Sequence, residues 1–148
     1  MDKNKKSIID VLLYPQSSLD FIFVTGLPGA GKTTFAANWY FKNHFEADQW
    51  MVDDTKNYYF DPKKLGYCHS QCLQATENAM SAGEEVVVSN TSLTKKEAKP
   101  YFLLAKKYKY NIVLIHLMTE YKSIHNVPEN KLQQMFNRRE LYKINEII

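Results

Sequence analysis

The feature that most constrains this chain is a glycine-rich stretch that directly follows a short apolar run. The run, Phe21-Ile22-Phe23-Val24, is continuously apolar, as expected of a strand buried on both faces. The stretch after it, Gly26-Leu27-Pro28-Gly29-Ala30-Gly31-Lys32-Thr33, fits the phosphate-binding loop, or P-loop, that joins a strand to a helix. Residue frequencies alone would produce this pattern in about 0.6% of chains of this length. Residues 26–33 are therefore predicted to bind a chain of phosphates.

Each residue type in this loop has a chemical reason to be there. The three glycines lack the Cβ atoms that would keep the backbone amides away from phosphate oxygens. The Lys32 ammonium can reach the β- and γ-phosphate oxygens, and the Thr33 hydroxyl can ligate Mg²⁺. The following helix directs its first amides at the phosphates, and Thr34 lies in that first turn. We therefore expect ATP and Mg²⁺ to bind here.

The rest of the chain narrows the class of P-loop protein. No Asn-Lys-X-Asp tetrad for reading guanine is present, which argues against a GTPase. The apolar runs 86–88 and 112–115 do not end in a carboxylate, so the water-activating acid of a motor ATPase is missing from its usual place. The remaining acidic candidate is Asp53-Asp54, after the predicted strand 49–52. A carboxylate there can accept the proton of an attacking hydroxyl, whereas the structural alternative is a turn or a helix cap.

Apolar runs of strand length alternate with helical stretches along the chain, which is typical of βαβ units. The predicted fold class is α/β: a three-layer α/β/α P-loop domain of the kinase type with a central parallel sheet of four to five strands. Residues 1–18 are expected to be peripheral and residues 19–148 to form one domain. The strands are expected at 21–24, 49–52, 85–88 and 111–117. Helices are expected at 8–13, 32–41, 65–82, 95–108 and 129–142.

Local signals mark several helix ends. Gly83 lies where a helix C-terminus favours a residue that is free to take a positive φ. Thr94 and Glu97 have the spacing of a capping box, which predicts a helix that starts after Thr94. Pro128 can occupy the first position of the last helix.

Composition adds weaker limits. The formal net charge of +3 permits a nucleic-acid binder but does not identify one, and the lysines either form a solvated surface or line a phosphate track. Cys68 and Cys72 supply too few ligands for a metal site and are expected to be reduced thiols. No apolar run is long enough to cross a membrane and no signal-peptide stretch follows the charged start, so we expect a cytoplasmic protein.

Further stretches stand in a characteristic order after the P-loop. They are Asp53-Asp54, Tyr59-Phe60-Asp61-Pro62, Leu65-Gly66, His69, Gly83, Val86-Val87-Val88-Ser89-Asn90-Thr91, Glu97-Ala98-Lys99-Pro100-Tyr101, Ile124-His125-Asn126-Val127-Pro128 and Met135-Phe136-Asn137-Arg138-Arg139-Glu140. This set resembles the polynucleotide 5′-hydroxyl kinase family of P-loop phosphotransferases, including small AAA- and zeta-toxin-like kinase domains. The resemblance covers roughly residues 20–141. Its specificity lies in the order, because many families share the P-loop alone.

The resemblance implies roles for residues beyond the P-loop. Asp53 would be the general base for a 5′-hydroxyl, and Asp54 would lie beside the substrate. Asn90 and Thr91 would lie at the floor of the site, near the acceptor or the γ-phosphate. The segment 119–127 would form a lid over ATP.

The lid departs from the family pattern. Kinases carry arginines there that stabilise charge on the transferred phosphoryl group, whereas this chain has none, and Lys122 stands at the corresponding position. Lysine supplies a point charge without the planar fork of arginine. The two arginines of the chain, Arg138 and Arg139, lie on the last predicted helix. One of them, with Arg138 as the candidate, is expected to face the nucleotide; the alternative is that both are solvated.

The sequence therefore predicts an ATP-dependent phosphotransferase that acts on the 5′-hydroxyl of RNA or DNA. Lys32, Mg²⁺ on Thr33 and Lys122 would neutralise charge in the transition state while Asp53 positions the hydroxyl. The expected partners are ATP and a single-stranded or nicked nucleic-acid 5′ end. A kinase for a nucleoside, sugar or antibiotic would use the same crevice, and the arginine-free lid also allows an ATP-binding module with little turnover.

Overall fold

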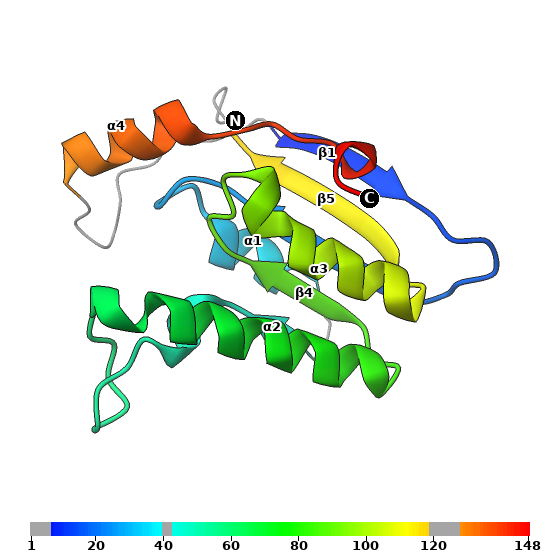
Figure 1. The fold of residues 1–148 in the computed structure, drawn as a ribbon, viewed down its shortest axis with the longest axis horizontal. Coiled ribbons are helices and arrows are strands. Elements are labelled where there is room, and N and C mark those ends of the chain that lie inside the picture. The colour runs from blue at the N-terminus through cyan, green and yellow to red at the C-terminus, as the bar shows by residue number, and fades with distance from the viewer. Residues whose placement is uncertain (1–6, 40–42, 119–127) are drawn as a thin grey trace.

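The computed structural model describes residues 7–39, 43–118 and 128–148. They form a five-stranded sheet with helices on both faces (Figure 1). The strands are β1 (Ser7–Leu12), β2 (Asp20–Thr25), β3 (Asn43–Phe45), β4 (Val86–Ser89) and β5 (Asn111–Leu117), in the order β1-β5-β2-β4-β3. Strands β2 to β5 are parallel, and β1 runs antiparallel to β5 at one edge. The predicted α/β fold is confirmed.

The central strand β2 is buried on both faces because alternate side chains enter two separate cores. Phe21 and Phe23 pack into the larger core, which lies under α2 (Leu65–Ser81) and α3 (Lys95–Tyr108) in front of the sheet (Figure 1). Ile22 and Val24 face the other side, where they pack with Ala30 and Ala36 of the P-loop and α1 (Lys32–Ala37). This two-sided burial explains the unbroken apolar sequence of the strand.

The remaining elements follow local signals in the sequence. Gly83 has φ +73° just after α2, as predicted, and the Thr94 hydroxyl accepts a hydrogen bond from the Glu97 amide at 3.3 Å at the start of α3.

None of the helices that the structure describes is long and apolar enough to cross a bilayer. The other helices are α4 (Glu129–Arg138) and the 3₁₀ turns η1 (Ala47–Trp50), η2 (Pro62–Lys64) and η3 (Ile144–Glu146).

The first described element is a strand, so the helix predicted at 8–13 is wrong. Ser7–Leu12 pairs with β5 along its whole length, and the β-branched Ile8, Ile9 and Val11 favour that extended conformation. The Asp10 carboxylate also accepts a hydrogen bond from the Ile144 amide at 2.8 Å, which fastens the C-terminal turn to this strand.

The second parallel strand lies earlier than the sequence predicts. It is β3 at Asn43–Phe45, whereas residues 47–50 form η1 and Val52 makes an isolated bridge with Tyr58. The apolar run that suggested a strand at 49–52 is explained by Met51, which is 1% exposed and packs into the larger core from a turn. A short apolar run does not distinguish a strand from another buried segment.

Two helices end earlier than the sequence predicts. The first ends at Ala37 instead of 41, and the last ends at Arg138 instead of 142. The residues after Arg138 leave the helix because Tyr142 is drawn into the core, where its hydroxyl donates a 2.7 Å hydrogen bond to the Ser92 carbonyl.

Candidate nucleotide-binding site

The P-loop lies at the carboxyl ends of the parallel strands, the edge at which open α/β sheets bind ligands. Gly29 and Gly31 have φ of 82° and 85°, a region that residues with a Cβ rarely adopt. A Cβ on Gly26 would lie 3.2 Å from the Ala30 Cβ and 3.3 Å from the Leu117 Cβ. The loop therefore packs closely against the end of β5, and a larger residue at these glycines would strain the backbone or displace neighbouring side chains.

A buried polar network holds the P-loop from behind. The Thr25 hydroxyl, directly before Gly26, lies 2.9 Å from His116 Nδ1, and His116 Nε2 lies 2.8 Å from the Tyr142 carbonyl. Burial lowers the pKa of His116, so the ring is neutral at pH 7. Because a carbonyl can only accept, the proton is assigned to Nε2, and Nδ1 accepts from Thr25. The C-terminal segment thus fixes the strand that leads into the loop.

Lys32 lies folded over the P-loop, where its Nζ donates to the Leu27 carbonyl at 3.1 Å. Burial lowers its pKa to about 8, although the charges of Asp48 and Glu46 act in the opposite direction; the charge of Arg139 lowers it further. The charges that act on Lys32 therefore come from two segments, one directly after β3 and one directly after α4 (Glu129–Arg138).

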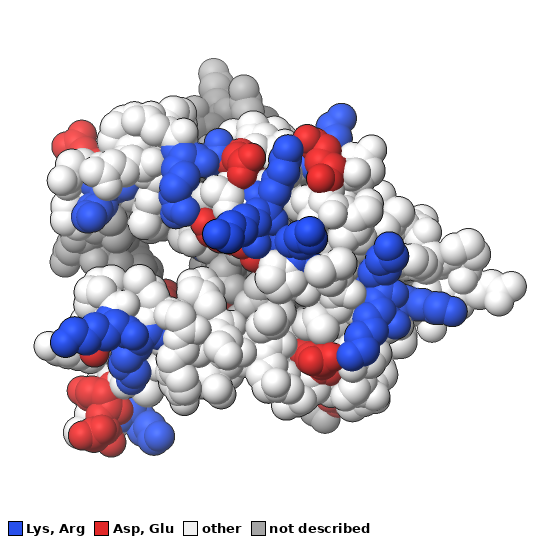
Figure 2. All heavy atoms as spheres, viewed as in Figure 1, with Lys and Arg blue, Asp and Glu red and all other residues white. Residues whose placement is uncertain are grey.

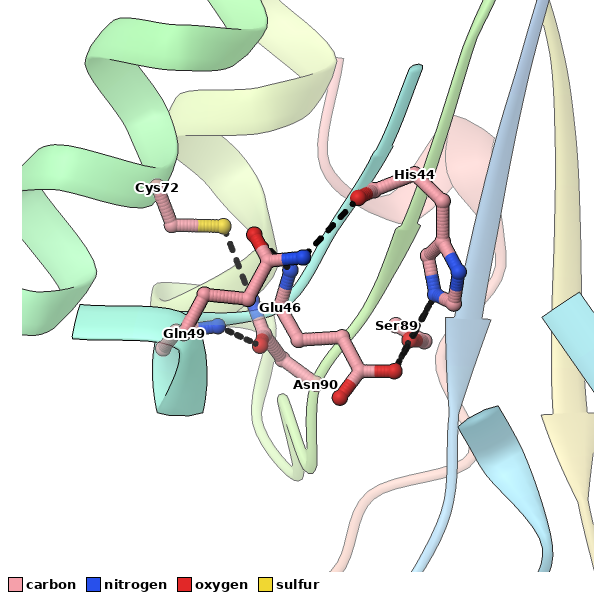
Figure 3. A network of polar contacts seen from close by, with 7 residues as sticks. His44, Glu46, Gln49, Cys72, Ser89 and Asn90 are labelled. Atoms are coloured by element: carbon pink, nitrogen blue, oxygen red, sulfur yellow. Dashed lines mark hydrogen bonds and ion pairs between the residues drawn. The ribbon is translucent and has the colours of Figure 1, made fainter. Parts of the chain in front are cut away.

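Glu46 belongs to a polar network at the ends of β3 and β4 (Figure 3). Its Oε1 lies 3.0 Å from the Ser89 hydroxyl, which donates to it, and 3.1 Å from His44 Nε2. Burial tends to raise the pKa of Glu46, but hydrogen bonds from His44, from the Thr33 hydroxyl and from Ser89 outweigh it and the pKa is lowered. Glu46 is therefore an ionised carboxylate at the end of β3, beside Ser89.

This network is unsuited to serine-type hydrolysis. His44 Nε2 lies 2.8 Å from the Ser89 hydroxyl, but the same nitrogen contacts Glu46, so the carboxylate does not orient the opposite side of the ring as in a catalytic triad. Ser89 is also 3% exposed and could not meet a substrate.

Asn90 binds the backbone of the segment that follows β3 and contains Glu46 and Asp48. Its Oδ1 accepts a hydrogen bond from the Ala47 amide at 2.8 Å, and its Nδ2 donates to Cys72 Sγ at 3.7 Å (Figure 3). The same Nδ2 donates to the Tyr101 hydroxyl at 3.5 Å. The side chain is buried and fully engaged with η1 and the helices behind it. Its predicted contact with acceptor or phosphate, like that of half-buried Thr91, stays a prediction.

Asp53 lies in an exposed turn and does not follow a strand of the sheet. Its Oδ1 accepts hydrogen bonds from the Thr55 hydroxyl at 2.6 Å, the Thr55 amide at 2.8 Å and the Asn57 amide at 3.1 Å. The Thr55 hydroxyl and then the Asn57 amide lower the pKa of Asp53 most. The strand-end argument for Asp53 and for its exposed neighbour Asp54 is therefore wrong, and their catalytic and substrate roles stay predictions.

Asp48 is an acid near the end of β3 that the sequence analysis did not single out. Once β3 ends at Phe45, the carboxylates that follow a strand are Glu46 and Asp48, and both act on Lys32. Asp48 is exposed, as a group that receives a substrate proton must be. The sequence offered one signal for this site, namely two acids two positions apart directly after His44-Phe45. The more apolar residues 50–52 favoured a strand later in the chain, so the predicted strand end fell beyond these acids.

The two arginines point to different places. Arg138, the sequence candidate, forms an exposed ion pair with Glu97 at 2.7 Å. Arg139 Nη2 donates to the Leu117 carbonyl at 3.0 Å, and its charge reaches Lys32. Its Nε is buried without a hydrogen-bond partner among the described residues. Arg139 is therefore the arginine near the P-loop, while Lys122 and the predicted lid at 119–127 lie outside the described residues.

The donors around the P-loop suit a hard cation. Thr33 and Glu46 offer oxygen atoms, and Mg²⁺ is usually held by one or two such groups together with water and phosphate. Within residues 7–39, 43–118 and 128–148, no group of three or more His, Cys, Asp or Glu could hold a metal by itself. Cys68 and Cys72 are buried free thiols, as predicted.

The surface is hollowed on the side where α4 and the start of α2 lie, with basic side chains above and below the hollow (Figure 2).

The fold and the P-loop together define a P-loop protein of the kinase type. The AAA_33 family model, described as an AAA domain, matches residues 21–125, which is more than half of the chain. The chain belongs to this polynucleotide kinase-like P-loop family, as the resemblance predicted.

Two curated relatives match most of this chain. Human NEDD4-binding protein 2 is 29% identical over 134 residues, which cover 79% of this chain and 7% of the relative. The "Putative bifunctional polynucleotide phosphatase/kinase" of Acanthamoeba polyphaga mimivirus is 29% identical over 123 residues, which cover 83% of this chain and 24% of the relative. The chain thus spans a small part of both relatives. The crystal structure of APE1195 is 18% identical, with a TM-score of 0.47 over 62% of this chain and 58% of that one.

Proposed function

We propose that this protein is an ATP-dependent kinase that phosphorylates the 5′-hydroxyl of RNA or DNA. The observation that carries the proposal is the formed P-loop at the carboxyl end of β2, with Lys32 folded over it and the exposed Asp48 in the turn that follows β3. Family membership supports kinase-type chemistry, and the name of the mimivirus relative suggests a polynucleotide acceptor. The cytoplasm, where ATP is abundant, is the proposed location.

The residues of the site divide the work of phosphoryl transfer. Asp48 accepts the proton of the attacking hydroxyl, whose oxygen bonds to the γ-phosphorus while the bond to the β–γ bridging oxygen breaks and ADP leaves. Lys32 holds the phosphate oxygens, and Arg139 adds a second positive charge on the same side. When bound, Mg²⁺ neutralises part of the negative charge on the phosphates.

The test compares two acids in one assay, with labelled ATP and a 5′-hydroxyl oligonucleotide. D48N is expected to lower transfer about 10²- to 10⁴-fold, with ATP binding retained, because it removes the proton acceptor. D53N is the matched control and is expected to keep transfer, because the Asp53 carboxylate is occupied by its own turn. The opposite result would return the general base to Asp53.

The wild-type protein tests the acceptor. Absence of transfer to every oligonucleotide would falsify the polynucleotide assignment. Transfer to a nucleoside, sugar or antibiotic in a panel of hydroxyl compounds would then identify a small-molecule kinase. Tight ATP binding in calorimetry with no transfer to any acceptor would instead show a nucleotide-binding module.

A further inference from the structure

The strand beside the P-loop strand lacks the carboxylate that P-loop NTPases place there. In such proteins Mg²⁺ is held by the P-loop Ser or Thr and by an acid at the end of a neighbouring strand. Here the neighbour is β4, which pairs Ser89 with Val24 of β2 and ends at that serine. Ser89 is buried and uncharged, so β4 itself supplies no anion to the site.

Glu46 brings a carboxylate to this same position from the next strand. Because β3 pairs with β4, with Phe45 opposite Val88, the residue after β3 lies beside Ser89. The Ser89 hydroxyl donates to Glu46 Oε1 at 3.0 Å, which shows that the acid reaches the end of β4 (Figure 3). The Thr33 side chain is among the groups that lower the pKa of Glu46, which agrees with a carboxylate on the P-loop side of the sheet.

The surroundings of Glu46 hold it in this place. His44 Nε2 contacts the same Oε1 at 3.1 Å, and the Glu46 amide lies 3.4 Å from Gln49 Oε1, to which it donates. Behind it, Asn90 fixes the Ala47 amide. A carboxylate held by several contacts at the end of β4, beside the strand that leads into the P-loop, is positioned to act on a cation.

We propose that Glu46 is the carboxylate that holds the Mg²⁺ ion of the bound nucleotide, in the role that the end of β4 would otherwise fill. This inference rests on the proposed nucleotide function but concerns binding rather than transfer. The serine at the end of β4 is then part of the arrangement, because its hydroxyl orients the glutamate that replaces a strand-end acid.

The experiment measures how much Mg²⁺ strengthens nucleotide binding, by calorimetry with ATP in Mg²⁺ and in EDTA. The gain from Mg²⁺ is the ratio of ATP affinity in Mg²⁺ to ATP affinity in EDTA. E46Q is expected to reduce this gain about 10- to 100-fold, since it keeps the shape of the side chain but removes its charge. Binding of metal-free ATP is expected to stay equal or become tighter, because a negative charge near the phosphates is lost. E77Q, which removes a surface acid on α2 that pairs with Lys107, is the matched control and is expected to keep the full gain.

A second variant tests whether a carboxylate at this position is sufficient, whichever residue supplies it. S89D in the E46Q background places a carboxylate at the end of β4 and is expected to restore most of the gain from Mg²⁺. If E46Q does not fold, E46D, which withdraws the charge by one methylene, is expected to lose part of the gain. A full gain from Mg²⁺ in folded E46Q or E46D, or an equal loss with and without Mg²⁺, would overturn the proposal.

These measurements separate the inference from the kinase assignment. A protein that transfers phosphate to no acceptor, but loses its Mg²⁺ gain in E46Q, would keep the role of Glu46 and lose the proposed function. A protein that transfers phosphate but shows an unchanged gain from Mg²⁺ in E46Q would keep the proposed function and lose the role of Glu46.

Discussion

The two halves of the candidate site are built in different ways. The P-loop is shaped by its own backbone, with positive φ at Gly29 and Gly31 and close packing of Gly26 against the end of β5. The segment 46–58, which carries the acids, follows a three-residue strand and depends on contacts from elsewhere in the chain. Asn90 holds its backbone and Ser89 holds its glutamate. The phosphate side is shaped largely by its own glycines, with support from β5 and the C-terminal segment, whereas the acidic side depends on the side chains that follow β4.

The difference also appears in the electrostatics. Lys32 is the residue at which the two halves meet, since its pKa reflects burial in the loop together with the acids of the other segment. A change on either side therefore acts on the same ammonium group, and variants can separate the contributions of the two halves.

The largest effect is expected from K32A, on the P-loop side. Loss of the ammonium that holds the phosphate oxygens should lower phosphoryl transfer about 10²- to 10³-fold. The decrease is measured as transfer from labelled ATP, alongside ATP affinity in calorimetry. K96A, an exposed lysine on α3, is the control and should change neither. Normal affinity and normal rates in K32A would contradict the assignment of the loop.

A smaller effect is expected from N90A, on the acidic side. The buried Ala47 amide would lose its acceptor, which costs about 1–3 kcal/mol of stability. Urea unfolding measures this loss, with N78A on the exposed side of α2 as the control. Because the P-loop is untouched, ATP binding should persist while transfer falls. An ATP affinity that falls as far as the transfer rate would show that the two halves are not separable.

Nucleotide affinity should depend on pH through Lys32. The Lys32 pKa is about 8 in the free protein and must rise when phosphates bind, so nucleotide affinity is greatest below pH 8, where the amine is already protonated. It should then fall as pH rises, by up to about tenfold per unit, because binding must first protonate the amine. Calorimetry between pH 7 and pH 9.5 tests this expectation. K32R, which stays protonated, should bind with a flat profile; a similar decline in that variant would place the titration elsewhere.

The smallest effect is expected from D53A. The turn would lose the acceptor for Thr55 and Asn57, so the thermal unfolding midpoint should decrease slightly. ATP affinity should not change, because Asp53 is not among the charges that act on Lys32 in the described residues. A marked loss of ATP affinity in this variant would show that the turn closes on the nucleotide.

The elements that could be predicted from the sequence are those with strong local signals. The strand at 111–117 and the helices that begin at Leu65 and Lys95 occur where predicted, because periodicity, Gly83 and Thr94 specify them. The short strand β3 has no such signal, since Asn43–Phe45 contains two polar residues and is only half-buried at the sheet edge. The predicted strand end therefore fell at Asp53, whose catalytic role stays a prediction, whereas the acids that follow β3 are Glu46 and Asp48.

The sequence by itself determined that this chain folds as an α/β domain around a P-loop, because glycine spacing and apolar runs act over a few residues. The tertiary structure decided which charged groups meet that loop. Glu46 and Asp48 lie beside a stronger apolar run, and Arg139 is far from them in the chain. The pairing of β3 with β4 and the contact of the C-terminal segment with the end of β5 place their charges where they act on Lys32. Charge acts through space, so its partners are fixed by the packing of the sheet and not by local sequence.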